Sequence, residues 1–212
     1  MATIPQYTLI HGDAADHAQA AELLFTDPPY ELAGDKLASI LRPYQCDHLV
    51  LITTMRQLLN FMRASDWELS FDFVIDGVAP KKSRNIQQPN YTHQTGVYLT
   101  RNGAKSRFDR KRRQRADVFE ANGYWPTIFH APRQQMQEHG HAKNLQAMTD
   151  IIASFDVQHV CDPFLGSGTT MLAAFDLDIS CTGIEKDSEQ FARLRKAIRF
   201  VGGAYNNLRV IT

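Results

Sequence analysis

The sequence lacks a long apolar run and has few residues that could cross-link it. No uninterrupted apolar segment approaches the ~20 residues of a membrane span. The first residues, Met-Ala-Thr-Ile-Pro-Gln, lack the basic and apolar regions of a signal peptide, so we expect no export signal. The three cysteines, Cys46, Cys161 and Cys181, have neither paired nor metal-ligand spacing. We therefore expect reduced thiols in a cytoplasmic protein.

Internal repeats and low-complexity segments are also absent. The chain has 212 residues, of which 43% are hydrophobic and 22% are charged. These values are typical of an ordinary globular protein with an adequate core. We expect a single domain that spans residues 1–212.

Net charge is zero, but positive charge is concentrated in one segment. This segment contains Asp109 as its one acid and eight basic residues: Arg101, Lys105, Arg107, Arg110, Lys111, Arg112, Arg113 and Arg115. The rest of the chain carries 15 basic and 22 acidic residues. A basic segment on a mildly acidic body favours a nucleic-acid partner, and a solvated helix face is the alternative.

Apolar patterning predicts strands that alternate with helices. The predicted strands cover residues 7–11, 21–25, 48–52, 69–75, 96–100, 158–161 and 181–185. The predicted helices cover residues 14–22, 35–41, 55–64, 144–155, 169–175 and 188–200. In the helix at 55–64, Leu58, Leu59, Phe61 and Met62 form most of the apolar face, and residues 77–90 form a loop. Roughly seven strands with interleaved helices predict an α/β fold with an open, doubly wound, mostly parallel sheet.

The segment Thr26-Asp27-Pro28-Pro29-Tyr30 follows a short apolar run. Two consecutive prolines stop both strand and helix, so a stiff loop is expected at a strand end. The loop offers a carboxylate, the carbonyl of Pro28 and an aromatic ring. Two acceptors can hold the hydrogens of a nucleobase amino group and free its lone pair, while the ring stacks on the flipped base. A turn that only ends the strand is the alternative.

A second motif runs from Asp162 to Thr170, between a predicted strand and a predicted helix. Gly166 and Gly168 allow a tight turn and close approach of a ligand to the backbone. Glu185 ends the next strand, about twenty residues later, where such folds place an acid that binds ribose hydroxyls. A structural turn is the alternative, but the spacing and the lack of a Gly-Lys-Thr/Ser phosphate loop favour an adenosine-bearing cofactor other than a nucleoside triphosphate.

Together, Asp-Pro-Pro-Tyr and the later Asp-Pro-Phe-Leu-Gly-Ser-Gly-Thr-Thr resemble the amino-group DNA methyltransferases of the β class. The resemblance implies a Rossmann-like fold of permuted motif order, S-adenosyl-L-methionine as cofactor and double-stranded DNA as partner, in a bacterial or phage-infected cytoplasm. It implies a monomer or homodimer, without metal or membrane. The implied catalytic residues are Asp27, Pro28, Pro29 and Tyr30. The implied cofactor residues are Asp13, Thr26, Lys143, Asp162, Phe164, Gly166, Ser167, Gly168, Thr169 and Glu185.

Two elements depart from the family pattern. A His-Pro-Thr-Gln-Lys-Pro element of the family appears here as residues 139–144, where only His139 and Lys143 match. The family often has a Glu on the strand that Gln94 occupies. His130, His139 and His141 lie close in sequence, but no Cys or carboxylate completes a zinc site, so we expect surface histidines.

Target recognition is expected in a small insertion at about residues 80–122. In addition to Arg107, Arg110, Lys111, Arg112, Arg113 and Arg115, which would contact phosphates, we expect a second contact from Lys81, Lys82 and Arg84. The predicted target atom is N6 of adenine, because the cytosine enzymes more often have Ser in place of Asp27. Alternatives are N4 of cytosine, adenine N6 in RNA, and a catalytically silent nucleic-acid-binding module.

Overall fold

The computed structural model describes residues 4–81, 87, 91–109, 127–130, 145–201 and 207–212. In these residues the elements, in chain order, are β1 (Tyr7–His11), β2 (Leu23–Thr26), α1 (Gly34–Leu41), β3 (His48–Thr53), α2 (Met55–Ala64), β4 (Glu68–Lys81), β5 (Tyr91–Thr100), β6 (Ile128–His130), α3 (Leu145–Ala153), β7 (His159–Asp162), α4 (Thr169–Asp176), β8 (Ser180–Glu185), α5 (Ser188–Val201) and β9 (Leu208–Ile211). None of the helices in this part of the chain combines the length and the apolar character that a membrane span requires.

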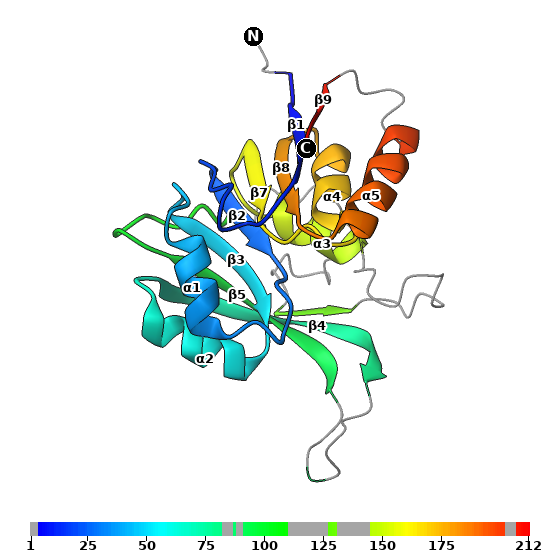
Figure 1. The fold of residues 1–212 in the computed structure, drawn as a ribbon. Helices are drawn as coiled ribbons and strands as arrows, with labels where there is room; N and C mark the ends of the chain where they lie inside the picture. The colour runs from blue at the N-terminus through cyan, green and yellow to red at the C-terminus, as the bar shows by residue number, and fades with distance from the viewer. Residues whose placement is uncertain (1–3, 82–86, 88–90, 110–126, 131–144, 202–206) are drawn as a thin grey trace.

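All the strands belong to one sheet, in the order β6-β4-β5-β3-β2-β7-β8-β1-β9 (Figure 1). Strand β5 runs antiparallel to both of its neighbours, β3 and β4, and the other pairs are parallel. Helices α1 and α2 cover one face of the sheet, and α3, α4 and α5 cover the other (Figure 1). The predicted doubly wound, mostly parallel α/β sheet is therefore confirmed.

Strand β3 separates the two hydrophobic cores. Its Val50 and Ile52 pack into the core beneath α3, α4 and α5, whereas Leu49 and Leu51 pack into the core beneath α1 and α2. All six residues of β3 are buried, as expected for a strand that helices cover on both faces. Full burial of each such side chain contributes about 1.5–3 kcal/mol, so the centre of the sheet is a rigid support for the loops at its ends.

Over the residues that the structure describes, the sheet has two more strands than the sequence predicts. Strand β6 has three residues and β9 has four, and runs this short carry too little alternation to be recognised. Strand β4 continues to Lys81, so the prediction of a loop is wrong for residues 77–81. Of these residues, Lys81 pairs with Tyr91 of β5, and a register irregularity separates this pair from Asp76. Pro80 lies in this irregular part of the strand, where proline is tolerated.

Five of the six predicted helices are confirmed, and the predicted helix at 14–22 is absent. There the Asp13 side chain accepts a hydrogen bond from the Ala15 amide at 3.0 Å and starts a turn instead. A nine-residue helix is marginal without packing, so this local bond prevails. In α2, the prediction that Leu59 lies on the apolar face is also wrong, because its side chain is 50% exposed. The polar Gln57 is buried on that face instead.

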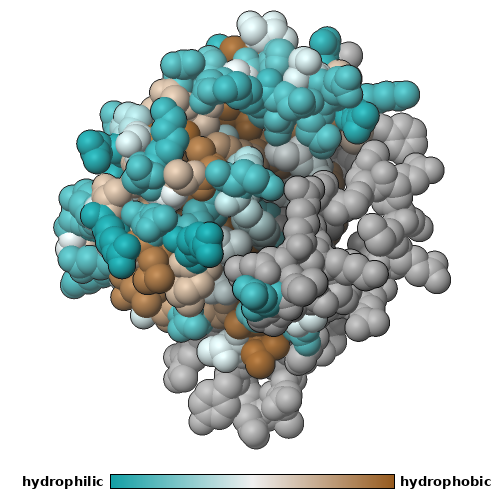
Figure 2. Space-filling model, turned by 60° about the horizontal axis from the view of Figure 1, so that its bottom comes forward, coloured by the Kyte–Doolittle hydropathy of each residue, from teal (hydrophilic) through white to brown (hydrophobic). Residues whose placement is uncertain are grey.

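Large apolar side chains reach the surface at separate positions: Ile4, Tyr30, Met55, Leu59, Leu69 and Ile128. On the face in Figure 2, the hydrophobic residues form small patches between hydrophilic ones. Scattered apolar residues of this kind are normal on a globular surface. Of these side chains, only Tyr30 belongs to a motif that the sequence singles out.

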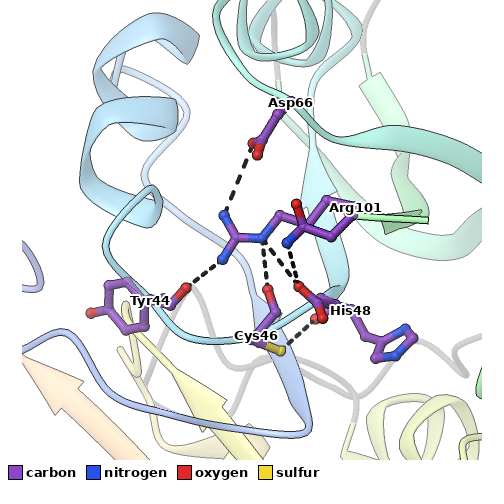
Figure 3. A network of polar contacts seen from close by, with 7 residues as sticks. Tyr44, Cys46, His48, Asp66 and Arg101 are labelled. Atoms are coloured by element: carbon purple, nitrogen blue, oxygen red, sulfur yellow. Dashed lines mark hydrogen bonds and ion pairs between the residues drawn. The ribbon is translucent and has the colours of Figure 1, made fainter. Parts of the chain in front are cut away.

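Arg101 is a buried structural residue. Its inclusion in the basic segment that favours a nucleic-acid partner is therefore wrong. Its side chain is 7% exposed and lies at the end of β5 (Figure 3). The guanidinium donates to the Cys46 carbonyl at 2.8 Å and to the Tyr44 carbonyl, and it lies 4.6 Å from the centre of the Trp67 ring. These contacts fasten the turn before β3 to the sheet.

We predict that Arg101→Ala lowers the free energy of unfolding by about 3 kcal/mol, because two buried carbonyls lose a charged donor. For a chain of this size the melting temperature should fall by roughly 6–12 °C, as measured by calorimetry. Lys105→Ala is the control: Lys105 is exposed, and its removal should change stability by less than about 0.5 kcal/mol. Wild-type stability combined with weakened DNA binding would contradict the structural role of Arg101.

Candidate active site

The two sequence motifs follow neighbouring parallel strands, β2 and β7. After β2 the chain enters α1 on one face of the sheet, and after β7 it enters α4 on the opposite face. In open α/β sheets, ligands bind at the carboxyl ends of strands where the connections diverge in this way. The topology therefore brings the Asp27–Tyr30 loop and the Gly166 turn to the usual position of a binding site.

A buried carboxylate joins the two motifs directly. Asp162, at the end of β7, accepts hydrogen bonds from the Thr26 hydroxyl at 2.8 Å and the Thr170 hydroxyl at 2.6 Å. It also accepts from the Phe164 amide at 3.0 Å. Burial raises the pKa of Asp162 to about 6, although these hydrogen bonds favour the ionised form. Thr26 and Asp162 are both almost fully buried, so they fix the two loops relative to each other.

Gln94, a residue of the sheet, holds Tyr30 by a hydrogen bond. The Gln94 side-chain amide on β5 donates to the Tyr30 hydroxyl at 2.5 Å, and the tyrosine is 37% exposed. Partial burial raises the pKa of Tyr30 above its usual value, and the negative charge of Asp27 raises it further. Tyr30 is therefore neutral at physiological pH, with its hydroxyl fixed at a strand of the antiparallel part of the sheet.

The two glycines of the turn after β7 have different structural roles. Both have positive φ, 53° at Gly166 and 83° at Gly168. A Cβ on Gly168 would lie 2.4 Å from the Leu194 side chain of α5, so this glycine is required for packing as well as for the turn. Among the described residues, a Cβ on Gly166 would have only the Phe164 carbonyl within 4 Å, at 3.8 Å. Of the two, Gly166 is therefore the one with space beside it.

Glu185, at the end of β8, lies against this turn. Its carboxylate accepts from the Gly166 amide at 2.8 Å and from the Asp187 amide at 2.7 Å. The Gln190 side chain donates to the Gly166 carbonyl at 2.9 Å, so both backbone groups of Gly166 are held. A carboxylate has about four acceptor positions, which leaves Glu185 able to accept further hydrogen bonds.

The other predicted cofactor residues border these groups. Lys186, next to Glu185, donates to the Asp13 carboxylate at 2.6 Å, and this bond lowers the pKa of Asp13. The Ser167 and Thr169 hydroxyls are 2.9 Å apart, at the start of α4. Phe164 is partly buried and packs against the core beneath α1 and α2. Apart from Lys143, the structure thus brings the predicted cofactor residues to the ends of β1, β2, β7 and β8.

Most residues predicted to contact nucleic acid lie outside the described residues: Lys82, Arg84, Arg110, Lys111, Arg112, Arg113 and Arg115. The same holds for Lys143, His139 and His141, while the backbones of Lys81 and His130 lie in β4 and β6. Arg107 is described, with a half-exposed side chain that donates to the Asp156 carbonyl at 2.9 Å and lies 3.6 Å from Glu22. Within the described ranges, no three His, Cys, Asp or Glu side chains form a group that could hold a metal ion.

Four polar side chains of the site are not recognised from the sequence: Gln57, Thr170, and the Lys186 and Gln190 described above. Gln57 of α2 donates to the carbonyls of Pro29 and Leu32, at 3.0 and 2.7 Å. Thr170 bonds Asp162, as described above. A polar residue within the apolar face of a predicted helix was the available signal for Gln57, since buried polar groups usually have a structural partner.

Several solved structures share this fold. The M1.HpyAVI–SAM complex is 20% identical with a TM-score of 0.67, covering 90% of this chain and 99% of that one. A putative DNA modification methylase from Thermus thermophilus, complexed with S-adenosyl-L-methionine, is 16% identical with a TM-score of 0.67, covering 97% of this chain and 100% of that one. The PvuII DNA methyltransferase, which is cytosine-N4-specific, is 14% identical with a TM-score of 0.69, covering 99% and 96%. At these identities the likeness shows a common fold.

Comparison with curated protein sequences gave no match. A family model described as DNA methylase, of the N6/N4 methyltransferase type, matches residues 76–196. The matched segment includes the Gly166 turn and Glu185, and it begins after the Asp27–Tyr30 loop. Because this segment is more than half of the 212 residues, the chain belongs to the N6/N4 DNA methylase family.

Proposed function

We propose that the protein transfers a methyl group from S-adenosyl-L-methionine to N6 of a flipped-out adenine in double-stranded DNA. The observation that carries this proposal is the junction at Asp162, whose hydrogen bonds hold the Asp27–Tyr30 loop beside the Gly166 turn. A methyl acceptor at one motif and a methyl donor at the other would meet at this junction. Membership of the N6/N4 family and two SAM-bound structures of the same fold support it.

The residues around Gly166 fit the proposed cofactor. Gly166 has space on the side where a Cβ would lie, and Glu185 retains acceptor positions for the two hydroxyls of a ribose. The Asp13 carboxylate, paired with Lys186 next to Glu185, would lie toward the adenine end. This part of the pocket would be completed by Phe164, Ser167 and Thr169 and shaped by Gly168. Lys143 would approach the methionine carboxylate. When bound, the cofactor supplies an electrophilic methyl group.

The residues of the loop would prepare the target nitrogen. The Asp27 carboxylate and the Pro28 carbonyl would accept hydrogen bonds from the two amino hydrogens, which frees the nitrogen lone pair. Asp27 would also stabilise the positive charge that develops on nitrogen and accept a proton from it. The Tyr30 ring would stack on the extruded base, and Pro29 would keep the loop stiff. Thr26 and Asp162 would not contact the base; they would hold the loop in position through their mutual hydrogen bond.

Cytosine N4 is the second candidate target, and the PvuII enzyme, which shares the fold, is specific for it. Both targets are ring-conjugated amines that need the same two acceptors. A charged acceptor at Asp27 stabilises the developing positive charge better than a hydroxyl at this position would, which favours adenine. Adenine is also the easier base to extrude, because an A·T pair is weaker than a G·C pair. RNA adenine is a weaker candidate, since the matching family is one of DNA methylases.

We further propose that a small insertion at about residues 80–122 of this single catalytic domain recognises the duplex. Its basic residues would contact phosphates, which position a protein on DNA without reading sequence. The internal partners of Arg107 reduce its expected share of this contact relative to the other basic residues.

Asp27→Ala should abolish methyl transfer, with a loss of at least about 10²–10³-fold, because a charged acceptor in the transition state is removed. Cofactor affinity should remain, since Asp27 engages the target base. Gly166→Val should instead weaken cofactor binding about 10-fold or more, because a branched residue at φ 53° is strained and fills the adjacent space. Calorimetric cofactor titration and radiolabelled transfer measure both effects.

The control for this pair is Asp35→Ala, which removes an exposed carboxylate from the first turn of α1 and should leave both properties unchanged. Full activity of Asp27→Ala would exclude the loop as the catalytic element.

Neutralising Arg110, Lys111, Arg112 and Arg113 together should weaken binding to all duplex sequences alike. The slope of log K against log salt should become shallower by roughly 0.9 for each phosphate that the variant no longer neutralises. Neutralising Arg193, Arg195 and Lys196, which are exposed on α5, is the matched control and should keep the wild-type slope. An unchanged slope in the first variant would mean that the basic segment is only a solvated surface.

Nucleoside mass spectrometry of unmethylated DNA, treated with the enzyme and cofactor, should detect N6-methyladenine. The same DNA treated with Asp27→Ala provides the background. N4-methylcytosine without N6-methyladenine would replace the adenine assignment by the cytosine one.

A further inference from the structure

Gln57 is a fully bonded polar side chain within the hydrophobic face of α2. It is 3% exposed, and its side-chain NH₂ group donates to two carbonyls of the loop after β2, Pro29 at 3.0 Å and Leu32 at 2.7 Å. Its side-chain oxygen accepts from the Thr53 hydroxyl at 2.8 Å. All three contacts are short, so the amide is fixed at both ends. A buried amide whose donors and acceptor are all engaged in one place holds the groups that it binds.

Gln57 lies in the first turn of α2, where this helix packs directly against α1. Thr54 caps the start of α2, since its hydroxyl accepts from the Gln57 backbone amide at 3.3 Å. At the first residue of α1, a Cβ on Gly34 would lie 2.2 Å from the Gln57 carbonyl, so the two helices approach as closely as glycine allows. The short connection between Tyr30 and α1 is therefore packed directly against the start of α2.

These hydrogen bonds determine which carbonyl of the loop can accept a hydrogen bond from the target base. The Pro29 carbonyl accepts from the Leu32 amide at 2.9 Å as well as from Gln57, which occupies both of its lone pairs. The neighbouring carbonyl, that of Pro28, then has to supply the backbone acceptor. We infer that Gln57 is the positioning residue that locks the Asp27–Tyr30 loop and directs the Pro28 carbonyl to the target amino group.

The inference rests on the proposed methyl transfer and adds a residue to it. Gln57→Met keeps the length and volume of the side chain but cannot donate to Pro29 and Leu32. Displacement of an acceptor by about 1 Å can reduce a rate by about 10²-fold. In single-turnover transfer with saturating DNA and cofactor, we expect a loss of about 10- to 100-fold, with the dissociation constants for cofactor and DNA within about twofold of wild type.

Thr54→Ala is the matched control for stability. It removes the cap of the same helix and should lower the melting temperature by about 2–4 °C without changing the Gln57 amide contacts. Its transfer rate should stay within about twofold of wild type. A Gln57→Met rate equal to that of wild type, or a similar loss in Thr54→Ala, would overturn the positioning role.

Amide hydrogen exchange provides a readout that does not depend on activity. The Leu32 amide, which donates to Pro29, should exchange about tenfold faster in Gln57→Met than in Thr54→Ala if Gln57 locks the loop. Equal exchange in the two variants would refute the lock. A wild-type protein that transfers no methyl group, but in which exchange depends on Gln57, would refute the proposed function and its acceptor role while confirming the lock.

Discussion

The hydrogen bonds of the Asp162 carboxylate are the constraint on which the site depends. They connect the end of β2, the turn after β7 and the start of α4, which are separate in sequence and adjacent in the sheet. The two motifs are thus parts of one buried polar network. Displacing either loop would leave a carboxylate with too few hydrogen-bond donors in an apolar setting, which is unfavourable.

This network has an energetic cost for folding. The pKa of Asp162 is raised from its ordinary value of 3.8 to about 6, so the native state binds a proton more tightly than the unfolded chain does. The stabilisation from this group is fully present below about pH 4 and is lost as the pH rises through 6. At neutral pH, ionised Asp162 lowers stability by about 3 kcal/mol at 1.36 kcal/mol per pKa unit. The apolar side chains of β3, covered on both faces, offset a cost of this size.

The sequence predicts the architecture well where local patterning is strong. Strand β3 and helix α2 have clear periodicity, and their boundaries are confirmed to within a residue. Strands β6 and β9 have too few residues to show a pattern, and the helix expected at 14–22 gives way to a turn that one aspartate nucleates. The misassigned Arg101 illustrates the same limit: its burial depends on carbonyls 55 and 57 residues away.

For the site, composition and spacing identify the motif residues but not their contacts. The pairing of Thr26 with Asp162 spans 136 residues, and only the strand order makes it predictable. In the sequence, Gln57 is only a polar interruption of an apolar helix face. Its role depends on a loop carbonyl that lies 25 residues earlier in the chain. The contact roles of these side chains follow from tertiary packing, whereas the chemistry of Asp27 and Tyr30 follows from residue type.

The two outer strands of the sheet have a consequence for association between molecules. An open sheet ends in unpaired backbone amides and carbonyls, which can template the addition of a strand from another chain. In the described part of this sheet the outermost strands are the three-residue β6 and the four-residue β9, and β9 carries an exposed charge at Arg209. At the β9 margin, this short and charged strand gives an incoming strand little backbone to pair with. This margin of the sheet can therefore resist edge-to-edge aggregation without closure into a barrel.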